Sequence, residues 1–203
     1  ASALDFQVDF RESTYQTQAG DTFSDLLLQH ESEILIQSTI TPGLENISTA
    51  VFAGGVNRNY SMMMRTTVDV GVSGRYVFQV GTDWGRGGAA ALIDDRDGSI
   101  INERVIIGDT WWANDFNHPD VYTTTFDLNA GDSYTRVWVG YENCCGGSST
   151  VRFSVDGGGF MPLTDPNFSP FVASPEPSSA LLISLGMLAL GIGRKDRNPA
   201  RLN

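Results

Sequence analysis

The feature that most constrains the fold of this chain is a strict alternation of apolar and polar residues in several short segments. In the clearest segment, residues 60–70, Tyr60, Met62, Met64 and Val68 alternate with polar neighbours such as Arg65. Successive side chains of a strand point to opposite faces, so this period of two predicts a half-buried β-strand. The same pattern predicts strands at residues 4–10, 33–41, 75–81, 89–94, 99–107, 122–128, 133–141 and 150–156.

Helix signals are almost absent from the chain. Only residues 23–30 place apolar side chains at helical spacing, after a possible cap at Asp21. His30 ends that segment without a second histidine, a cysteine or a carboxylate cluster beside it, so we expect a packed or surface residue rather than a metal ligand. About nine short strands separated by turn residues are typical of an antiparallel β-sandwich. We therefore predict an all-β protein of the jelly-roll type, with a sandwich domain over residues 1–163 and an apolar helix at the C-terminus.

The charge of the chain is strongly acidic. Residues 1–173 contain nine arginines, no lysine and 22 acidic residues, a balance of −13. Such a surface repels nucleic acid, so no nucleic-acid partner is expected. It suits solubility above all, and also calcium or polyol ligands.

The end of the chain has the composition of a membrane-targeting segment. A proline-rich linker, residues 164–179, contains Pro175, Glu176 and Pro177, and an uninterrupted run of apolar or small residues follows over residues 180–193. Arg194 and further basic residues come next, so a helix over residues 180–203 would insert in the inner membrane with its basic end in the cytoplasm. The order and composition resemble the PEP-CTERM sorting signal of Gram-negative bacteria. That resemblance implies an exosortase-type transpeptidase as partner, and release to the cell surface or extracellular matrix after transient anchoring.

The only two cysteines, Cys144 and Cys145, are adjacent. Neighbouring Cα atoms lie about 3.8 Å apart, below the usual disulfide range of about 4.4–6.8 Å. Three states remain open for an exported chain: a strained ring between the two, bridges to another molecule, or two free thiols. We favour the ring because Gly146 and Gly147 allow the backbone to turn. The Cys-Cys-Gly-Gly sequence ahead of the tail also resembles the CCXG group of PEP-CTERM proteins.

Enzyme motifs are missing from the sequence. There is no G-x-S-x-G nucleophile elbow, no histidine-rich metal spacing and no phosphate-binding loop. Carboxylate pairs such as Asp94 and Asp95 occur by chance in a chain this acidic. We therefore expect a protein that is not an enzyme.

A second resemblance covers roughly residues 59–163. The strand with Tyr76 and Phe78, the acidic loop at Asp83, the turn that ends at Gly131 and the segment with Tyr141 and Glu142 follow the order found in PA14-like domains. PA14-like domains serve as sugar-binding modules in adhesins and glycosidases. The resemblance implies a calcium site that joins the loops at residues 81–88 and 142–149.

In PA14-like adhesins two adjacent aspartates and an asparagine hold the calcium ion, to which the sugar binds. Here Asp83 matches one aspartate and Asn143 the amide, while Trp84 stands where the second carboxylate is expected. Glu142 and backbone carbonyls would have to complete the six to eight oxygen ligands of calcium. Without metal, the same loops would offer Trp84 as a stacking surface.

Three tryptophans, Trp84, Trp111 and Trp112, lie in or beside predicted loops. Flat rings there would stack on sugar faces, although two of the three could instead cover the ends of the sandwich. We therefore expect a surface-displayed protein that binds extracellular polysaccharide in adhesion or in a biofilm matrix. The alternative is a structural subunit that self-assembles by adding residues 4–10 to the sheet edge of another copy.

Overall fold

The structure, a computed structural model, describes residues 4–173 of the chain. The predicted sorting segment, from Pro175 to the end, lies outside the described residues. Within residues 4–173, no helix is long and apolar enough to cross a membrane.

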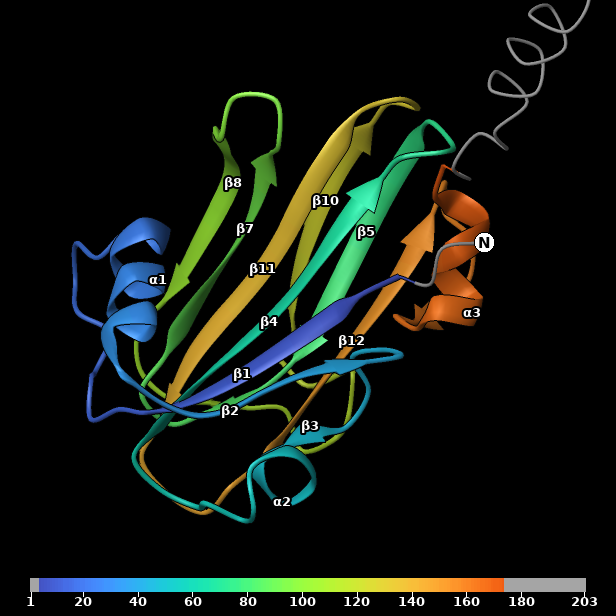
Figure 1. Cartoon of the computed structure of the whole chain (residues 1–203). Coiled ribbons are helices and arrows are strands. Elements are labelled where there is room, and N and C mark those ends of the chain that lie inside the picture. Colours follow the sequence, from blue (N-terminus) through green and yellow to red (C-terminus); the bar gives the residue numbers. More distant parts are fainter. Residues whose placement is uncertain (1–3, 174–203) are drawn as a thin grey trace, which may run out of the picture. The chain divides into compact units, whose positions relative to one another are not determined.

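Two antiparallel sheets form a sandwich, as the alternating pattern predicted (Figure 1). The first sheet has the order β2-β1-β4-β11-β7-β8. Its strands are β2 (Ile34–Thr41), β1 (Phe6–Glu12), β4 (Tyr60–Asp69), β11 (Ser133–Glu142), β7 (Gly88–Asp94) and β8 (Ile100–Ile106). The second sheet has the order β10-β5-β12-β13, with β3 also paired to β12. Its strands are β10 (Tyr122–Leu128), β5 (Gly74–Gly81), β12 (Ser148–Val155), β13 (Met161–Pro162) and β3 (Ile47–Ser48).

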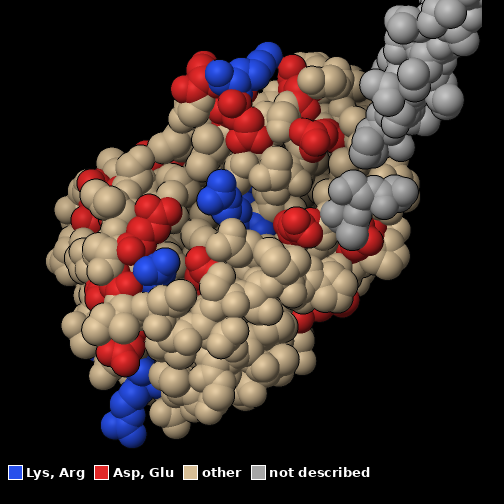
Figure 2. Space-filling view, in the orientation of Figure 1, with Lys and Arg blue, Asp and Glu red and all other residues tan. Residues whose placement is uncertain are grey.

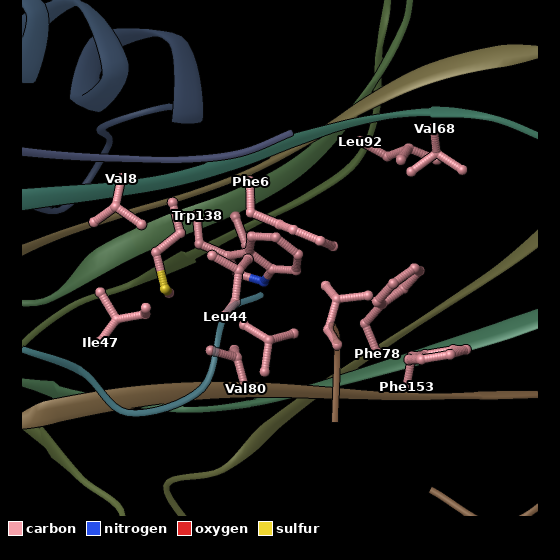
Figure 3. Packing of buried hydrophobic residues seen from close by; sticks show 14 of the residues in the cluster. Phe6, Val8, Leu44, Ile47, Val68, Phe78, Val80, Leu92, Trp138 and Phe153 are labelled. Carbon is pink, nitrogen blue, oxygen red and sulfur yellow. The ribbon is translucent and has the colours of Figure 1, made fainter. Parts of the chain in front are cut away.

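The core lies between the two sheets and is rich in aromatic rings. Phe6 and Trp138 project into it from the first sheet, and Phe78 and Phe153 project from the second (Figure 3). All four are at most 2% exposed. The alternation in the sequence is thus the inward and outward alternation of the two facing sheets.

Helix α1 (Phe23–Ser32) covers the outer face of the first sheet. It begins at a capping box in which Thr22 and Asp25 bond to each other's backbone N–H, so the predicted cap at Asp21 is wrong by one residue. Phe23 and Leu26 pack against the sheet, which makes this outer face a second, smaller core. The helix also buries His30, which is the packed one of the two positions that the sequence left open.

Strand β1 is not a free pairing element. It pairs with β2 along one edge and with β4 along the other, and its apolar side chains are fully buried. The expectation that residues 4–10 are available to another molecule is therefore wrong, because both edges of β1 are already hydrogen-bonded. The two edge strands of this sheet are β2 and β8.

The sandwich does not end at residue 163. Helix α3 (Asp165–Phe168) and the 3₁₀ turn η1 (Ser169–Phe171) belong to it, since Phe168 is fully buried. Its ring packs at 4.7 Å from that of Phe153. The predicted domain boundary is therefore wrong, because the proline-rich composition of this segment hid a core residue. A further short helix, α2 (Thr49–Phe52), lies next to β3.

Acidic side chains are spread over the face of the molecule shown in Figure 2, whereas arginines occur there in isolated places. On this face the negative charge is therefore spread over the surface rather than gathered in one patch.

Candidate functional site

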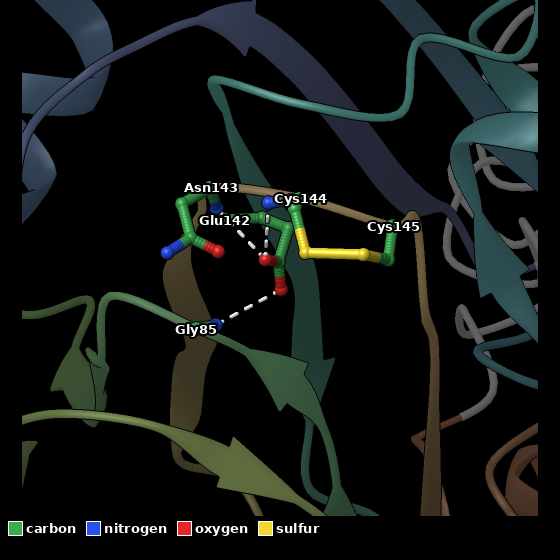
Figure 4. Close-up of a disulfide and its surroundings, with 5 residues drawn as sticks. All are labelled: Gly85, Glu142, Asn143, Cys144 and Cys145. Atoms are coloured by element: carbon green, nitrogen blue, oxygen red, sulfur yellow. Dashed lines mark hydrogen bonds between the residues drawn. A yellow bond between two sulfur atoms is a disulfide. The ribbon is translucent and has the colours of Figure 1, made fainter.

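The two loops that the sequence pairs do meet in the structure. Glu142, at the end of β11, accepts a hydrogen bond from the backbone N–H of Gly85 at 2.9 Å (Figure 4). Its other carboxylate oxygen accepts from the N–H groups of Asn143, at 2.7 Å, and Cys144, at 2.9 Å. The side chain is only 2% exposed. Glu142 therefore ties one loop to the other, with three backbone amides on its two oxygens.

Cys144 and Cys145 follow directly and are exposed. The structure joins their sulfur atoms in a disulfide, with Cα atoms 3.7 Å apart (Figure 4). Cys145 and Gly146 both have positive φ, at 74° and 58°. The glycine tolerates this backbone, which reverses the chain toward β12.

A third segment, which contains Trp111, lies beside these two loops. Strands β6 (Asp83–Trp84) and β9 (Thr110–Trp111) pair as a two-stranded ladder, with Asp83 opposite Trp111. This pairing places the segment that contains Trp111 beside the loop that contains Asp83. Gly147 then approaches so closely that any added Cβ would overlap the Asp83 side chain.

A pocket of about 270 Å³ opens where the three segments meet. Asp83 comes from β6, Trp111 from β9, Asn114 from the turn after it, and Ser148 from the start of β12. Its full lining is Ser48, Asp83, Trp111, Trp112, Ala113, Asn114, Gly146, Gly147 and Ser148. Polar groups and one exposed ring therefore share a small concave surface.

The three tryptophans differ sharply in exposure. Trp111 is 57% exposed and borders the pocket. Trp112 is 5% exposed, lies on Gly81, and donates from Nε1 to the Ser148 carbonyl at 2.9 Å. Trp84 is 1% exposed and belongs to the core, so its expected use as a stacking surface is wrong. Two of the three rings are thus buried, and Trp111 alone of the three has an exposed ring.

Asp83 has an unfavourable electrostatic environment for a carboxylate. Partial burial raises its pKa to about 6, and the negative charges of Glu142 and Asp109 add to that increase in pKa. Among the described residues, no hydrogen bond to the carboxylate offsets these effects. A bound cation at Asp83 would be stabilised by the same three negative charges.

The predicted calcium ligands fit a metal ion only in part. Asp83 fits, because its carboxylate lacks a donor partner. Glu142 is already engaged with three amides, and the amide oxygen of Asn143 lies next to Gly85. Within residues 4–173, no group of three or more His, Cys, Asp or Glu side chains is arranged to hold a metal.

Sequence reasoning missed Asn114 and Ser148. Each is a common polar residue in or beside a turn, and no local pattern marks it. Only the pairing of β9 with β6 and the reversal after Cys145 bring them to Asp83, and these contacts join segments about 30 to 60 residues apart in the sequence.

No protein-family model matches the sequence, and no curated protein does either. Among solved structures, the chain is similar to the Epithelial Adhesin 6 A domain from Candida glabrata, whose structure is a complex with Galβ1-3GlcNAc. The two share 13% identity over 86% of this chain and 88% of that chain, with a TM-score of 0.50.

The chain is also similar to two further solved structures. An anti-sigma factor domain-containing protein shares 14% identity over 87% of this chain, with a TM-score of 0.51, and the chain spans 50% of its length. The PA14 sugar-binding domain from an RTX adhesin shares 11% identity over 81% of this chain and 97% of that chain, with a TM-score of 0.47. At such identities the likeness concerns the fold: the protein is an antiparallel β-sandwich with the overall arrangement of an adhesin A domain.

Proposed function

We propose that the protein is a carbohydrate-binding module that acts in adhesion at the cell surface or in the extracellular matrix. The observation that carries this proposal is the pocket at Asp83, where an exposed tryptophan meets carboxylate, amide and hydroxyl groups. A sugar ring presents an apolar face and a rim of hydroxyl groups, so it needs both kinds of contact. This is a binding rather than a catalytic function.

Each part of the pocket has a separate role in this proposal. The Trp111 ring supplies the stacking surface, and it stands out from the domain at the pocket's edge. Asp83, Asn114 and Ser148 offer hydrogen-bond partners for sugar hydroxyls. The A domain of the Candida adhesin binds a disaccharide on a sandwich of the same arrangement, which supports the proposal without defining the ligand here.

Glycan-array binding of the full chain, followed by calorimetry on the best ligand, tests this function. Trp111→Ala should weaken binding at least tenfold. Ile40→Ala removes a similarly exposed apolar side chain from β2, a strand that contributes no residue to the pocket lining, and should leave binding unchanged. Equal binding by wild type and Trp111→Ala, or binding of no glycan at all, would contradict the proposal.

Calcium is a separate part of the proposal. We infer that Asp83 is the side-chain ligand of a calcium ion, with backbone carbonyls and the Asn143 amide as further oxygen donors. Calorimetric titration of the metal-free chain with calcium should then release or absorb heat, and Asp83→Asn should abolish that heat. Asp109→Asn, which removes a nearby charge without removing the ligand, should only weaken binding.

The C-terminal sequence supports export. We propose that Pro175, Glu176 and Pro177 form a sorting signal read by an exosortase-type transpeptidase, which releases the protein from the inner membrane. Alanine at these three positions should leave the full-length protein in the membrane fraction. If that variant is processed and released at the wild-type rate, the sorting proposal is wrong and the segment is an ordinary membrane anchor.

A second candidate function is self-assembly through β2. This strand forms one edge of the six-stranded sheet, opposite the β8 edge, and has no charged residue in its sequence ILIQSTIT. Its residues Ile34 and Ile40 are 68% and 58% exposed, although edge strands usually carry charges or proline. An antiparallel β2-to-β2 contact with a second copy would continue the sheet. Sedimentation velocity should then show a dimer that Ile40→Lys abolishes.

A further inference from the structure

Arg152 of β12 occupies an unusual position on the outer face of the second sheet. Its guanidinium carbon lies 4.0 Å from the ring centroid of Phe116 and 4.5 Å from that of Phe160. The two rings come from the loop after β9 and from the loop after β12. The guanidinium group is therefore held between two aromatic rings.

The nitrogen atoms of Arg152 are not all used. Nε donates to the Gln79 side chain of the neighbouring strand β5 at 2.8 Å. Within residues 4–173, neither Nη atom makes a hydrogen bond or ion pair with another residue. The two rings cover the faces of the guanidinium group and Nε is already hydrogen-bonded. The two Nη atoms are therefore the donors that remain for a ligand. A planar pair of N–H donors held in this way suits a carboxylate, which accepts both in a bidentate pair.

Arg152 and the pocket at Asp83 lie on one continuous surface. Ser148, in the pocket lining, and Arg152 are four residues apart on β12, so both point to the same face, about 13 Å apart at 3.3 Å per residue. Aromatic rings also connect the two places. Trp112 borders the pocket, and its ring centroid lies 4.9 Å from that of Phe116, which contacts Arg152. Thr150 lies between Ser148 and Arg152 on that face.

The negative charge of the rest of the domain makes the positioned positive charge of Arg152 important for binding an anion. Residues 1–173 are strongly acidic and repel anions in general. Partial burial lowers the pKa of Arg152, and the negative charge of Asp115 opposes this effect and favours the charged form. An anionic ligand would therefore gain affinity by pairing with a positioned arginine such as Arg152, which favours selectivity over general attraction.

We propose that the ligand of this protein is an acidic glycan, with one sugar ring in the pocket at Asp83 and the carboxylate of a neighbouring residue paired with Arg152. This inference rests on the proposed carbohydrate-binding function and adds the chemical class of the ligand. The Phe116 and Phe160 rings act as positioning groups that hold the guanidinium plane.

The test uses the full chain and a panel of uronate oligosaccharides built from glucuronate, galacturonate or mannuronate, each measured beside its methyl ester. At least one acid should bind about tenfold more tightly than its ester. Arg152→Gln should lower affinity for that acid to the level of the ester and leave affinity for the ester unchanged. Arg152→Lys keeps the charge without the planar fork and should lose most of the preference.

Matched variants separate the possible outcomes. Arg75→Gln removes an exposed arginine from the neighbouring strand β5 and should keep the preference for the acid. Thermal unfolding of each variant checks that it is folded. If wild type binds esters as tightly as acids, or if Arg152→Gln keeps the preference, the acidic-glycan inference fails while the sugar pocket stands. If no oligosaccharide of the panel or the array binds, the proposed function fails together with it.

Discussion

A glycine of β11 makes room for one of the two largest rings of the core. Gly140 faces the Trp84 indole so closely that an added Cβ would overlap the ring. Trp84 is among the largest fully buried side chains of the domain. The absence of a side chain on Gly140 thus makes room for a ring that would otherwise stand at the surface.

We predict that Gly140→Ala destabilises the domain by about 1–3 kcal/mol, because overpacking forces the ring or the strand to shift. Urea unfolding followed by tryptophan fluorescence measures the loss. Gly159→Ala is the control, since an added Cβ there meets no atom within 4 Å, and its effect should stay within about 0.5 kcal/mol. Equal midpoints for both variants would show that Trp84 does not depend on this space.

His30 is a titratable residue that is buried in the folded domain. Its Nδ1 lies 2.7 Å from the Ser61 hydroxyl, and the ring has no exposed surface. Burial lowers its pKa to about 4, and the nearby positive charge of Arg11 lowers the pKa further, against a smaller opposing effect of Asp9. The folded protein therefore holds a neutral imidazole that the unfolded chain would protonate at a higher pH.

The sign of the pH dependence follows from that difference. The unfolded histidine has a pKa near 6.5, so between about pH 6.5 and pH 4 the unfolded chain binds a proton that the folded domain does not. We predict that His30 lowers the free energy of unfolding by roughly 3 kcal/mol as the pH falls across that interval. Urea unfolding at several pH values should show a flatter profile for His30→Asn. An unchanged slope in the variant would assign the acid sensitivity to other groups.

At the scale of elements, the connection between β11 and the loop before β7 depends on one carboxylate. Glu142 accepts three backbone N–H groups, from Gly85, Asn143 and Cys144, which have no other acceptor in these contacts. We predict that Glu142→Gln destabilises the domain by about 1–3 kcal/mol, because its NH₂ group faces buried donors. Amide hydrogen exchange at Gly85 and Cys144 should accelerate, whereas exposed Glu45→Gln should change neither. Protection equal to wild type in Glu142→Gln would mean that the loops are held by other contacts.

Strands such as β4 and β10 could be predicted from the sequence because each has one face in the core. The alternation over residues 60–70 and 122–128 therefore corresponds to β4 and β10 with ends within one residue. Two-residue strands such as β6 and β9 carry no period and were missed. The pocket depends on the pairing of these two strands, so its residues were only partly predictable. The burial of Trp84 was equally hidden, because Gly140 lies 56 residues away in the sequence.

At the scale of the whole domain, residues 164–173 close the open end of the sandwich. Phe168 packs against rings of the second sheet, and the N–H of Gly71 donates to the Phe171 carbonyl at 2.8 Å. The N–H of Ala173 donates to the Asp69 carbonyl at 2.7 Å. Composition alone cannot distinguish such a segment from a linker, because its prolines lie in short helical turns beside the buried ring.

We predict that a chain ending at Leu163 does not fold stably, whereas a chain ending at Ala173 does. Loss of a buried phenylalanine alone costs about 3–5 kcal/mol, a large fraction of the 5–15 kcal/mol that stabilises a typical domain. Circular dichroism and urea unfolding of the two chains provide the measurement, and both lack the C-terminal segment, so only residues 164–173 differ. Phe168→Ala in the longer chain should account for most of the loss. Cooperative unfolding of the shorter chain at the urea midpoint of the longer one would restore the domain boundary to residue 163.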